Sequence, residues 1–162
     1  MQTDPEELAL LAFLVRLTGA RRILEVGTFT GYSSTGMALA MPPEGSMVCC
    51  DLSPEWTDIA RRAWADAGVA DRITLRLGPA LESMDAMLAA GDEGSFDIAY
   101  IDADKPGYPD YYERALLNQM DAAGIDVEQL SIHTPDLDDV FFAVTGHPIE
   151  AGETARQEAP LP

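Results

Sequence analysis

The segment from residue 23 to residue 33 constrains the fold of this chain more than any other part of the sequence. It reads Ile-Leu-Glu-Val-Gly-Thr-Phe-Thr-Gly-Tyr-Ser, so a short apolar run meets an acidic residue and then two glycines. A glycine lets a ligand approach the bare backbone, because it has no Cβ and tolerates a positive φ. A helix that begins near Gly31 would point its free N–H groups toward such a ligand. The segment therefore predicts the first strand, turn and helix of a nucleotide-binding α/β sheet.

The spacing within this loop separates two classes of nucleotide. The dinucleotide fingerprint is Gly-x-Gly-x-x-Gly, whereas Glu25 here takes the place of the first glycine and is followed by Gly27 and Gly31. A carboxylate beside the loop repels a pyrophosphate and attracts a cation. S-adenosylmethionine carries a sulfonium and an α-ammonium, so it suits this loop better than NAD does. For the loop taken alone, a tight strand-to-helix turn without a ligand is the alternative.

The composition fits a single domain with a strongly acidic character. The chain has 162 residues, of which 47% are hydrophobic, and its net charge is −18. That charge argues against nucleic acid as a partner, because phosphate binding needs a basic face. No long apolar run predicts membrane insertion, and no secretory leader is visible. Cys49 and Cys50 are neighbours on a predicted strand and point to opposite faces, which fits a reducing cytoplasm better than a disulfide framework.

Hydrophobic periodicity and turn residues predict an alternation of helices and strands. A first helix should be capped by Thr3 or Asp4 and end at Gly19. In the helix that starts at Pro54, one apolar face is expected to hold Trp56, Ile59, Ala60 and Ala63. Strands are expected at residues 22–26, 47–50, 72–77 and 96–101, and the helices between them at 33–41, 54–68 and 81–90. This order predicts an α/β fold with a Rossmann-like, doubly wound and mostly parallel sheet.

Acidic residues follow two of the predicted strands. Asp51 comes directly after the second strand, and Asp102 and Asp104 follow the fourth strand, with Lys105 next to them. Ligands collect beyond the carboxyl ends of parallel strands, so these side chains are expected at one site. Asp51 either accepts hydrogen bonds from ribose hydroxyls or caps the following helix. The residues from Asp102 to Lys105 either hold a hard cation beside a lysine base or form a solvated charged turn.

A family resemblance is carried by five stretches that occur in order along the chain. They lie at residues 24–33, 50–51, 78–80, 94–97 and 100–105, and Tyr108 and Tyr112 follow the last of them. With these motifs, residues 3–116 resemble class I S-adenosylmethionine-dependent O-methyltransferases. The closest group is the cation-dependent one that includes the catechol and caffeoyl-CoA O-methyltransferases. The resemblance implies an enzyme that transfers a methyl group to a hydroxyl, phenolic or catechol-like, of a small molecule.

The resemblance also implies a role for each matching position. The amino-acid part of the cofactor would be surrounded by the start of the first helix and by the glycine loop, at Thr3, Glu25, Gly27, Thr28, Gly31 and Ser33. Asp51 would bind the ribose, Ala80 would lie at the adenine, and Asp104 would also contact the cofactor. Asp102 would hold a divalent cation, usually Mg²⁺, and Lys105 would be the general base. A small-molecule acceptor and a possible homodimer follow from the same resemblance.

The family pattern breaks in two places, so the fold is expected to be truncated at both ends. Family members carry an N-terminal helical segment before the position of Met1. After the helix that follows the fourth strand, they continue with a Pro-Gly-Gly turn, a fifth strand and an Asp-Asn pair that completes the metal site. This chain instead reads Asn-Gln-Met-Asp-Ala-Ala-Gly over residues 118–124, and no Asp-Asn pair follows.

The C-terminal region has a resemblance of its own. Residues 124–146 resemble the C-terminal end of the ATP-binding subunits of drug-resistance ABC exporters, with a strand expected at 127–132 and a helix at 137–144. The expected parts are a methyltransferase core at 1–117, an exporter-like segment at 118–146 and a disordered tail at 147–162. The alternatives to an active methyltransferase are a catalytically inactive remnant fused to the exporter segment, a regulatory piece of an exporter, and an NAD-dependent oxidoreductase, which Glu25 disfavours.

Overall fold

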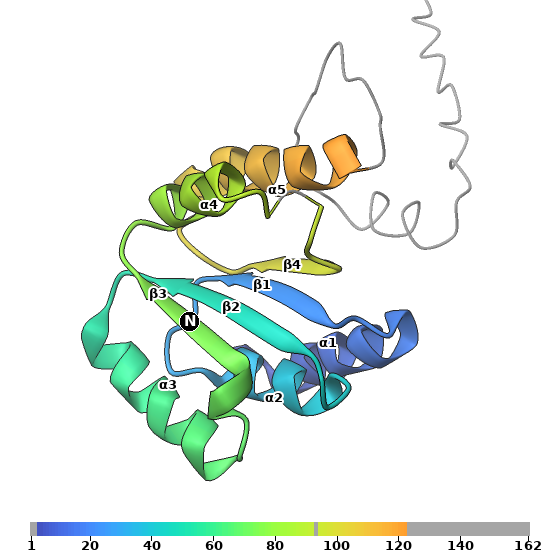
Figure 1. Ribbon diagram of the computed structural model, residues 1–162. Coiled ribbons are helices and arrows are strands. Elements are labelled where there is room, and N and C mark those ends of the chain that lie inside the picture. The colour runs from blue at the N-terminus through green and yellow to red at the C-terminus, as the bar shows by residue number, and fades with distance from the viewer. Residues whose placement is uncertain (1–2, 93, 123–162) are drawn as a thin grey trace, which may run out of the picture. The chain divides into compact units, whose positions relative to one another are not determined.

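The computed structural model describes residues 3–92 and 94–122. A four-stranded sheet forms the middle of this region, and helices cover both of its faces (Figure 1). The strands are β1 (Arg22–Val26), β2 (Ser46–Asp51), β3 (Ile73–Leu77) and β4 (Ile98–Ile101). The helices are α1 (Pro5–Thr18), α2 (Tyr32–Ala40), α3 (Pro54–Asp66), α4 (Ala80–Ala89) and α5 (Tyr108–Ala122), with 3₁₀ turns η1 (Ala70–Arg72) and η2 (Lys105–Gly107). None of the described helices has the length and apolar character that a membrane span requires.

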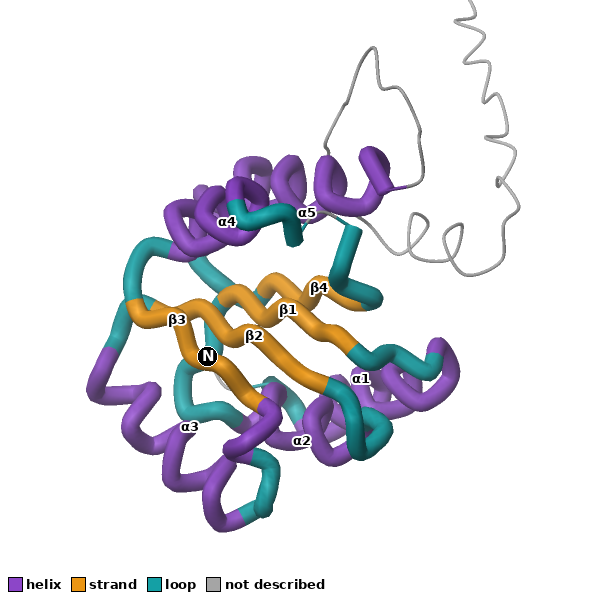
Figure 2. The backbone as a smooth tube through the Cα atoms, viewed as in Figure 1, coloured by secondary structure: helices purple, strands orange, loops and turns teal. Residues whose placement is uncertain are grey.

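All strand pairs in the sheet are parallel, and the strand order is β3-β2-β1-β4. The chain therefore moves outward from β1 through β2 to β3, and then returns to the other side of β1 for β4. Figure 2 shows the strands between the two helical layers. A crevice for ligands forms where the strand order reverses, which here is the carboxyl end of β1 and β4. The predicted doubly wound parallel sheet is confirmed.

The start and the end of α1 follow from its local sequence. The side chain of Asp4 accepts a hydrogen bond from Glu6 N at 2.9 Å, and Pro5 occupies the first helical position. At the other end Gly19 adopts a left-handed conformation with φ of 66°, and its position confirms the predicted stop. The hydroxyl of Ser53 caps α3 in the same way by accepting from Trp56 N.

Two separate hydrophobic clusters lie on the two faces of the sheet. One packs α1, α2 and α3 against the sheet and contains Cys49, Ile23 and Trp64. The other packs α4 and α5 against the opposite face and contains Cys50 and Met84. The two cysteines are unpaired and buried on opposite faces, as the strand pattern predicts. Helices α1, α2 and α3 and helices α4 and α5 thus form the two outer layers of Figure 1.

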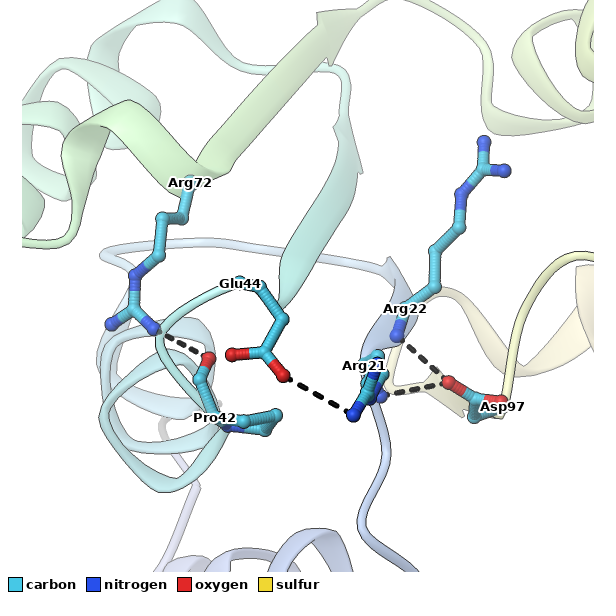
Figure 3. Close-up of polar contacts among 6 residues, drawn as sticks. All are labelled: Arg21, Arg22, Pro42, Glu44, Arg72 and Asp97. Atoms are coloured by element: carbon cyan, nitrogen blue, oxygen red, sulfur yellow. Dashed lines mark hydrogen bonds and ion pairs between the residues drawn. The ribbon is translucent and has the colours of Figure 1, made fainter.

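The amino ends of the strands are joined by polar contacts at the sheet edge opposite the crevice (Figure 3). The carboxylate of Asp97 accepts hydrogen bonds from the backbone N–H groups of Arg21 and Arg22, at 2.7 and 2.9 Å. The guanidinium of Arg72 donates to the carbonyl oxygen of Pro42 at 3.2 Å. Asp97 directly precedes β4, which begins at Ile98, two residues later than the sequence predicts.

The buried face of α3 differs from the predicted one. Its buried residues are Thr57, Ala60 and Trp64, whereas Trp56 and Ile59 are exposed. The ring of Trp56 contacts a loop residue at the crevice, and the indole of Trp64 fills the core position instead. The prediction for Ala60 is confirmed and that for Trp56 and Ile59 as buried core is wrong. The strand and helix predicted at 127–132 and 137–144 lie outside the described residues.

Candidate ligand-binding site

A cavity of about 280 Å³ lies at the carboxyl end of the sheet, where β1 and β4 meet. Its volume is just below the usual range for small-molecule sites, which begins at about 300 Å³. The wall is formed by the segment just before α1, the ends of β1 and β2 with their loops, the starts of α2, α3 and α4, the turn after β4, and α5. Its residues are Thr3, Val26, Gly27, Thr28, Phe29, Thr30, Tyr32, Ser33, Cys50, Asp51, Leu52, Trp56, Gly78, Ala80, Asp102, Ala103, Asp104 and Tyr111.

The two glycines of the loop serve different purposes. Gly27 has a φ of 94°, and a Cβ at this position would overlap the carbonyl oxygen of Asp102. The backbone of the loop can therefore approach β4 only because residue 27 lacks a side chain. Gly31, with a φ of 79°, lies outside the cavity wall, and its Cβ would sit 2.7 Å from the Cβ of Ala60. Gly31 thus allows α2 to pack closely against α3.

Among the described residues, Phe29 is the non-glycine residue with a positive φ. Its φ is 50°, in the left-handed region that bulky side chains rarely adopt. Such strain persists where the surrounding structure holds it, and it concentrates at functional sites. Here the ring of Phe29 contacts that of Trp56, with centroids 4.8 Å apart, and both rings line the cavity.

Asp51 ties the glycine loop to the end of β2. Its Oδ2 atom accepts hydrogen bonds from the backbone N–H groups of Thr28 and Phe29, at 2.9 and 2.8 Å. Its Oδ1 atom accepts from Ser53 N at 2.8 Å. The cap of α3 is supplied by Ser53 and not by Asp51. Since each carboxylate oxygen can accept two hydrogen bonds, Oδ1 retains one position for a ligand hydroxyl.

Glu25 lies directly behind the cavity wall. Its side chain has no exposed surface, and its Oε1 atom accepts a hydrogen bond from the hydroxyl of Ser33 at 2.6 Å. Burial raises the pKa of Glu25 from 4.5 to about 7, against the opposing effect of the Ser33 hydrogen bond. Burial and the neighbouring Glu25 also hold the pKa of the Cys49 thiol well above its usual value. Ser33 and Thr28 both line the cavity and lie against Glu25.

Two side-chain oxygens near the loop have no hydrogen-bond partner within the described part of the chain. They are Oε2 of Glu25 and Oγ1 of Thr28, and both are buried. A buried polar atom that is left unpaired is costly, so each such atom needs an explanation. Thr28 belongs to the cavity wall and also lies against Glu25, so its hydroxyl can pair with a ligand or with the carboxyl group of Glu25.

The turn after β4 contributes two carboxylates to the wall. Asp104 accepts hydrogen bonds from the hydroxyl of Tyr111 at 2.7 Å and from Gly107 N at 3.1 Å. Burial, followed by the bond to Asp104, raises the pKa of Tyr111 to about 12. Asp102 donates its own backbone N–H to Val26 O, which joins the end of β4 to the end of β1. Its carboxylate lines the cavity and is exposed.

The described residues supply only part of the ligand set that a Mg²⁺ ion needs. Mg²⁺ demands octahedral coordination by oxygen atoms, and no group of three or more His, Cys, Asp or Glu side chains converges anywhere in residues 3–92 and 94–122. Asp102 supplies one carboxylate, and the carboxylate of Asp104 is engaged by Tyr111 and Gly107. The charge of the wall nevertheless suits a cation, because its described residues include three aspartates and no Lys, Arg or His.

The structure brings most of the predicted site residues together. Those in the cavity wall are Thr3, Gly27, Thr28, Ser33, Asp51, Ala80, Asp102 and Asp104. Glu25 is buried behind the wall residue Ser33, and Gly31 packs against α3. Lys105 is exposed at the start of η2 and does not line the cavity. The roles assigned to these positions stay predictions.

The aromatic part of the wall was not predicted from the sequence. Phe29, Tyr32, Trp56 and Tyr111 all line the cavity, as does the exposed side chain of Leu52. Phe29 and Tyr32 lie inside the glycine motif, so the motif itself located them without indicating a role. The signal for Trp56 was its place in the first turn of the helix after Asp51, at the carboxyl edge of the sheet. Tyr111 had no comparable local signal.

The strand order and the cavity define an α/β protein with a ligand site at the switch point of a parallel sheet. Within this class, the model of the O-methyltransferase family matches residues 1–127. The chain belongs to that family.

Proteins similar to this chain come from animals, plants and bacteria. The catechol O-methyltransferase domain-containing protein 1 of Mus musculus is 49% identical over 111 residues, which are 68% of this chain and 42% of the mouse protein. Tricin synthase 1 of Oryza sativa subsp. japonica is 44% identical over 120 residues, which are 72% of this chain and 48% of the rice protein. This chain therefore spans about half the length of the relatives it matches.

Solved structures of O-methyltransferases have the same fold. The enzyme from Bacillus cereus, solved in complex with S-adenosylhomocysteine, has a TM-score of 0.68 and 38% sequence identity, over 71% of this chain and 52% of that one. TomG from Streptomyces achromogenes, solved in complex with S-adenosylmethionine, has a TM-score of 0.68 and 38% identity, over 71% of this chain and 51% of that one.

Proposed function

We propose that this chain binds S-adenosylmethionine and transfers its methyl group to a hydroxyl, phenolic or catechol-like, of a small molecule. The observation that carries the proposal is the cavity at the switch point, whose wall combines a glycine turn with three aspartates and no basic residue. A sulfonium and an ammonium suit that charge. The relatives named above include a tricin synthase and a catechol O-methyltransferase domain protein, which supports a phenolic acceptor.

Asp51 is the residue we assign to the ribose. Its Oδ2 atom holds the loop through Thr28 N and Phe29 N, and its Oδ1 atom faces the cavity with one free acceptor position. The same carboxylate would hold the loop and bind the ligand, so the loop would be rigid at the point where the ligand binds. Preorganisation of this kind lowers the entropy lost on binding.

The cofactor would bring an electrophilic methyl on a positively charged sulfur, and the acceptor oxygen would attack that methyl in line. The protein's part is then to align the two reactants and to exclude water. Phe29, Tyr32 and Trp56 give the wall an apolar rim beside the three aspartates. We propose Thr28 Oγ1, buried and without a partner in the described chain, as a hydrogen-bonding group toward the cofactor.

The proposal also assigns candidates for a cation ligand and for a general base. Asp102 is our candidate for a divalent cation such as Mg²⁺, but the described residues supply no further ligands around it. Lys105 is our candidate for the base, and its side chain is exposed next to Asp104. The proposed function therefore does not depend on a metal step. A cytoplasmic location, self-association and the exporter-like segment 118–146 remain predictions.

A calorimetric titration with S-adenosylhomocysteine, with and without Mg²⁺, tests the proposed function. We expect micromolar binding by the full chain, and at least tenfold weaker binding by Asp51→Asn, which removes the charge but nearly keeps the shape. Asp66→Asn is the matched control, because Asp66 is an exposed aspartate at the end of α3, outside the cavity wall. Absence of binding would refute the proposal. A gain in affinity with Mg²⁺ would support Asp102 as a cation ligand.

A further inference from the structure

The contact between Glu25 and Ser33 joins a fully buried carboxyl group to the wall of the cavity. Ser33 is 4% exposed and lines the cavity, and its hydroxyl donates to Glu25 Oε1 at 2.6 Å. The second oxygen of Glu25 has no hydrogen-bond partner among the described residues. An ionised carboxylate in this position is expensive, whereas a protonated one buries no charge. The arrangement therefore favours a proton on Glu25 while the cavity is empty.

Among the described residues, none of the side chains that act on Glu25 carries a positive charge. On the sheet its neighbours are Cys49 of β2 and Tyr100 of β4, which are its register partners. From α2 it meets Ser33 and Ser34, and from the loop Thr28. Tyr100 in turn donates its hydroxyl to Glu7 of α1 at 3.0 Å, so the charged group that this contact brings to that side is a second carboxylate. Within the described chain, a countercharge for Glu25 must come from the cavity.

We propose that Glu25 makes the cavity selective for a positively charged ligand, by holding a proton when the cavity is empty and releasing it to solvent when a cationic group seats near Ser33. This inference rests on the proposed function and refines it to a preference for the sulfonium cofactor over the neutral thioether product. Each protonated Glu25 releases one proton when the ligand binds: the side chain changes from carboxylic acid to carboxylate, and the proton passes to the buffer. Ser33 keeps the same donor role to Oε1.

The physical reason for selectivity is the difference in screening between buried and exposed charges. Asp51 is half-buried, and Asp102 and Asp104 are exposed, so water and salt weaken their attraction for a ligand. Glu25 is fully buried, and its attraction for a charge in the cavity is screened less. S-adenosylmethionine and S-adenosylhomocysteine differ by the methyl group and the sulfonium charge. Release of the proton should therefore be greater with S-adenosylmethionine than with S-adenosylhomocysteine.

The pKa of Glu25, which burial raises to about 7, brings this exchange into an accessible pH range. At pH 6.5 such a group is about three-quarters protonated in the empty protein. Full release on binding would therefore transfer about three-quarters of a proton to the buffer. The affinity for S-adenosylmethionine should also rise by about tenfold between pH 5.5 and pH 7, while the α-amino group of the ligand stays protonated.

The test is calorimetric titration of the full chain with S-adenosylmethionine and with S-adenosylhomocysteine at pH 6.5, in buffers of different ionisation enthalpy. The dependence of the measured heat on buffer gives the number of protons exchanged. We expect release of about three-quarters of a proton with S-adenosylmethionine and less with S-adenosylhomocysteine. Glu25→Gln, which keeps the side-chain volume, should bind without proton exchange. Glu55→Gln, an exposed glutamate of α3 outside the cavity wall, should behave as wild type.

The possible results separate the inference from the proposed function. Binding with the same heat in every buffer, proton uptake, or equal proton release by Glu25→Gln would overturn the inference and leave cofactor binding standing. Absence of binding by the wild type would overturn both. Should Glu25→Gln fail to fold, the wild type alone decides: an affinity for S-adenosylmethionine that does not change between pH 5.5 and pH 7 would overturn the proton linkage.

Discussion

Replacement of Glu25 by glutamine should make the empty protein more stable at pH 8. In the folded chain burial raises the pKa of Glu25 to about 7, whereas the ordinary value is 4.5. Each pH unit of difference corresponds to 1.36 kcal/mol, so the ionised state of Glu25 lowers the free energy of unfolding by about 3 kcal/mol. Glutamine never ionises, and its carbonyl oxygen can still accept the hydrogen bond from Ser33.

The sign and the pH range of this effect follow from proton linkage. Below pH 4.5 both the folded and the unfolded chain keep Glu25 protonated, and its ionisation has no effect. Between pH 4.5 and pH 7 the unfolded chain releases the proton and the folded chain retains it, so stability falls as the pH rises. Above pH 7 both states are ionised and the loss stays constant. Glu25→Gln should therefore stabilise by about 1 kcal/mol at pH 5 and about 3 kcal/mol at pH 8.

Urea unfolding at pH 5 and at pH 8, followed by the fluorescence of the two tryptophans, measures this difference. Trp64 is the informative probe because it is buried in the cluster under α3. Glu55→Gln removes an exposed glutamate from the first turn of α3 and should lower the free energy of unfolding by less than about 1 kcal/mol, by the same amount at both pH values. A gain from Glu25→Gln that is equal at pH 5 and pH 8 would show that burial does not raise the pKa of this group.

Three further outcomes test the packing and the charge of the site. Gly27→Ala should lower the free energy of unfolding by at least about 3 kcal/mol. The control Gly91→Ala, at a φ of 83° but with open space around the added Cβ, should lower it by only about 1–2 kcal/mol. Equal losses of the two variants in urea unfolding would refute the clash of residue 27 with β4. Trp64→Phe removes the buried bond to Ser34 Oγ and should cost about 1–2 kcal/mol in the same assay, whereas no change would mean that the bond is dispensable. NADH should fail to displace S-adenosylhomocysteine in a competition titration.

The sequence predicts the sheet well because its strands are short apolar runs bounded by polar or glycine residues. The prediction for β1 at residues 22–26 is confirmed residue for residue. The start of β4 is different: Asp97, which the sequence places inside the strand, precedes it, and its carboxylate bonds to the backbone of Arg21 and Arg22, more than 70 residues away. No local pattern reveals a partner at that distance. Elements are therefore more predictable than the residues at which they begin.

In the candidate site, too, the sequence predicts what local patterns determine and misses what contacts between elements determine. Positions at the carboxyl ends of strands were expected in one place, and Asp51, Asp102 and Asp104 do line one cavity. Contacts between elements were not foreseeable: Gly31 packs on Ala60 of α3, and neither residue lies at a strand end. The sequence likewise identified a carboxylate at position 25 without indicating that Ser33 separates it from the cavity, because that depends on how α2 lies on the sheet.

The hydrogen bonds of Asp51 explain how a fold shared with dinucleotide-binding proteins comes to favour a different ligand. In a phosphate-binding loop the backbone N–H groups after the first strand point at the phosphate. Here the N–H groups of Thr28 and Phe29 both donate to Asp51 Oδ2, so a carboxylate of the protein itself already occupies that anion position. A pyrophosphate would have to displace Asp51 and then lie beside Asp102 and Asp104, against Coulomb repulsion. The selectivity for a cationic ligand that we propose would therefore come from where the carboxylates lie, since the order of strands is compatible with both classes of ligand.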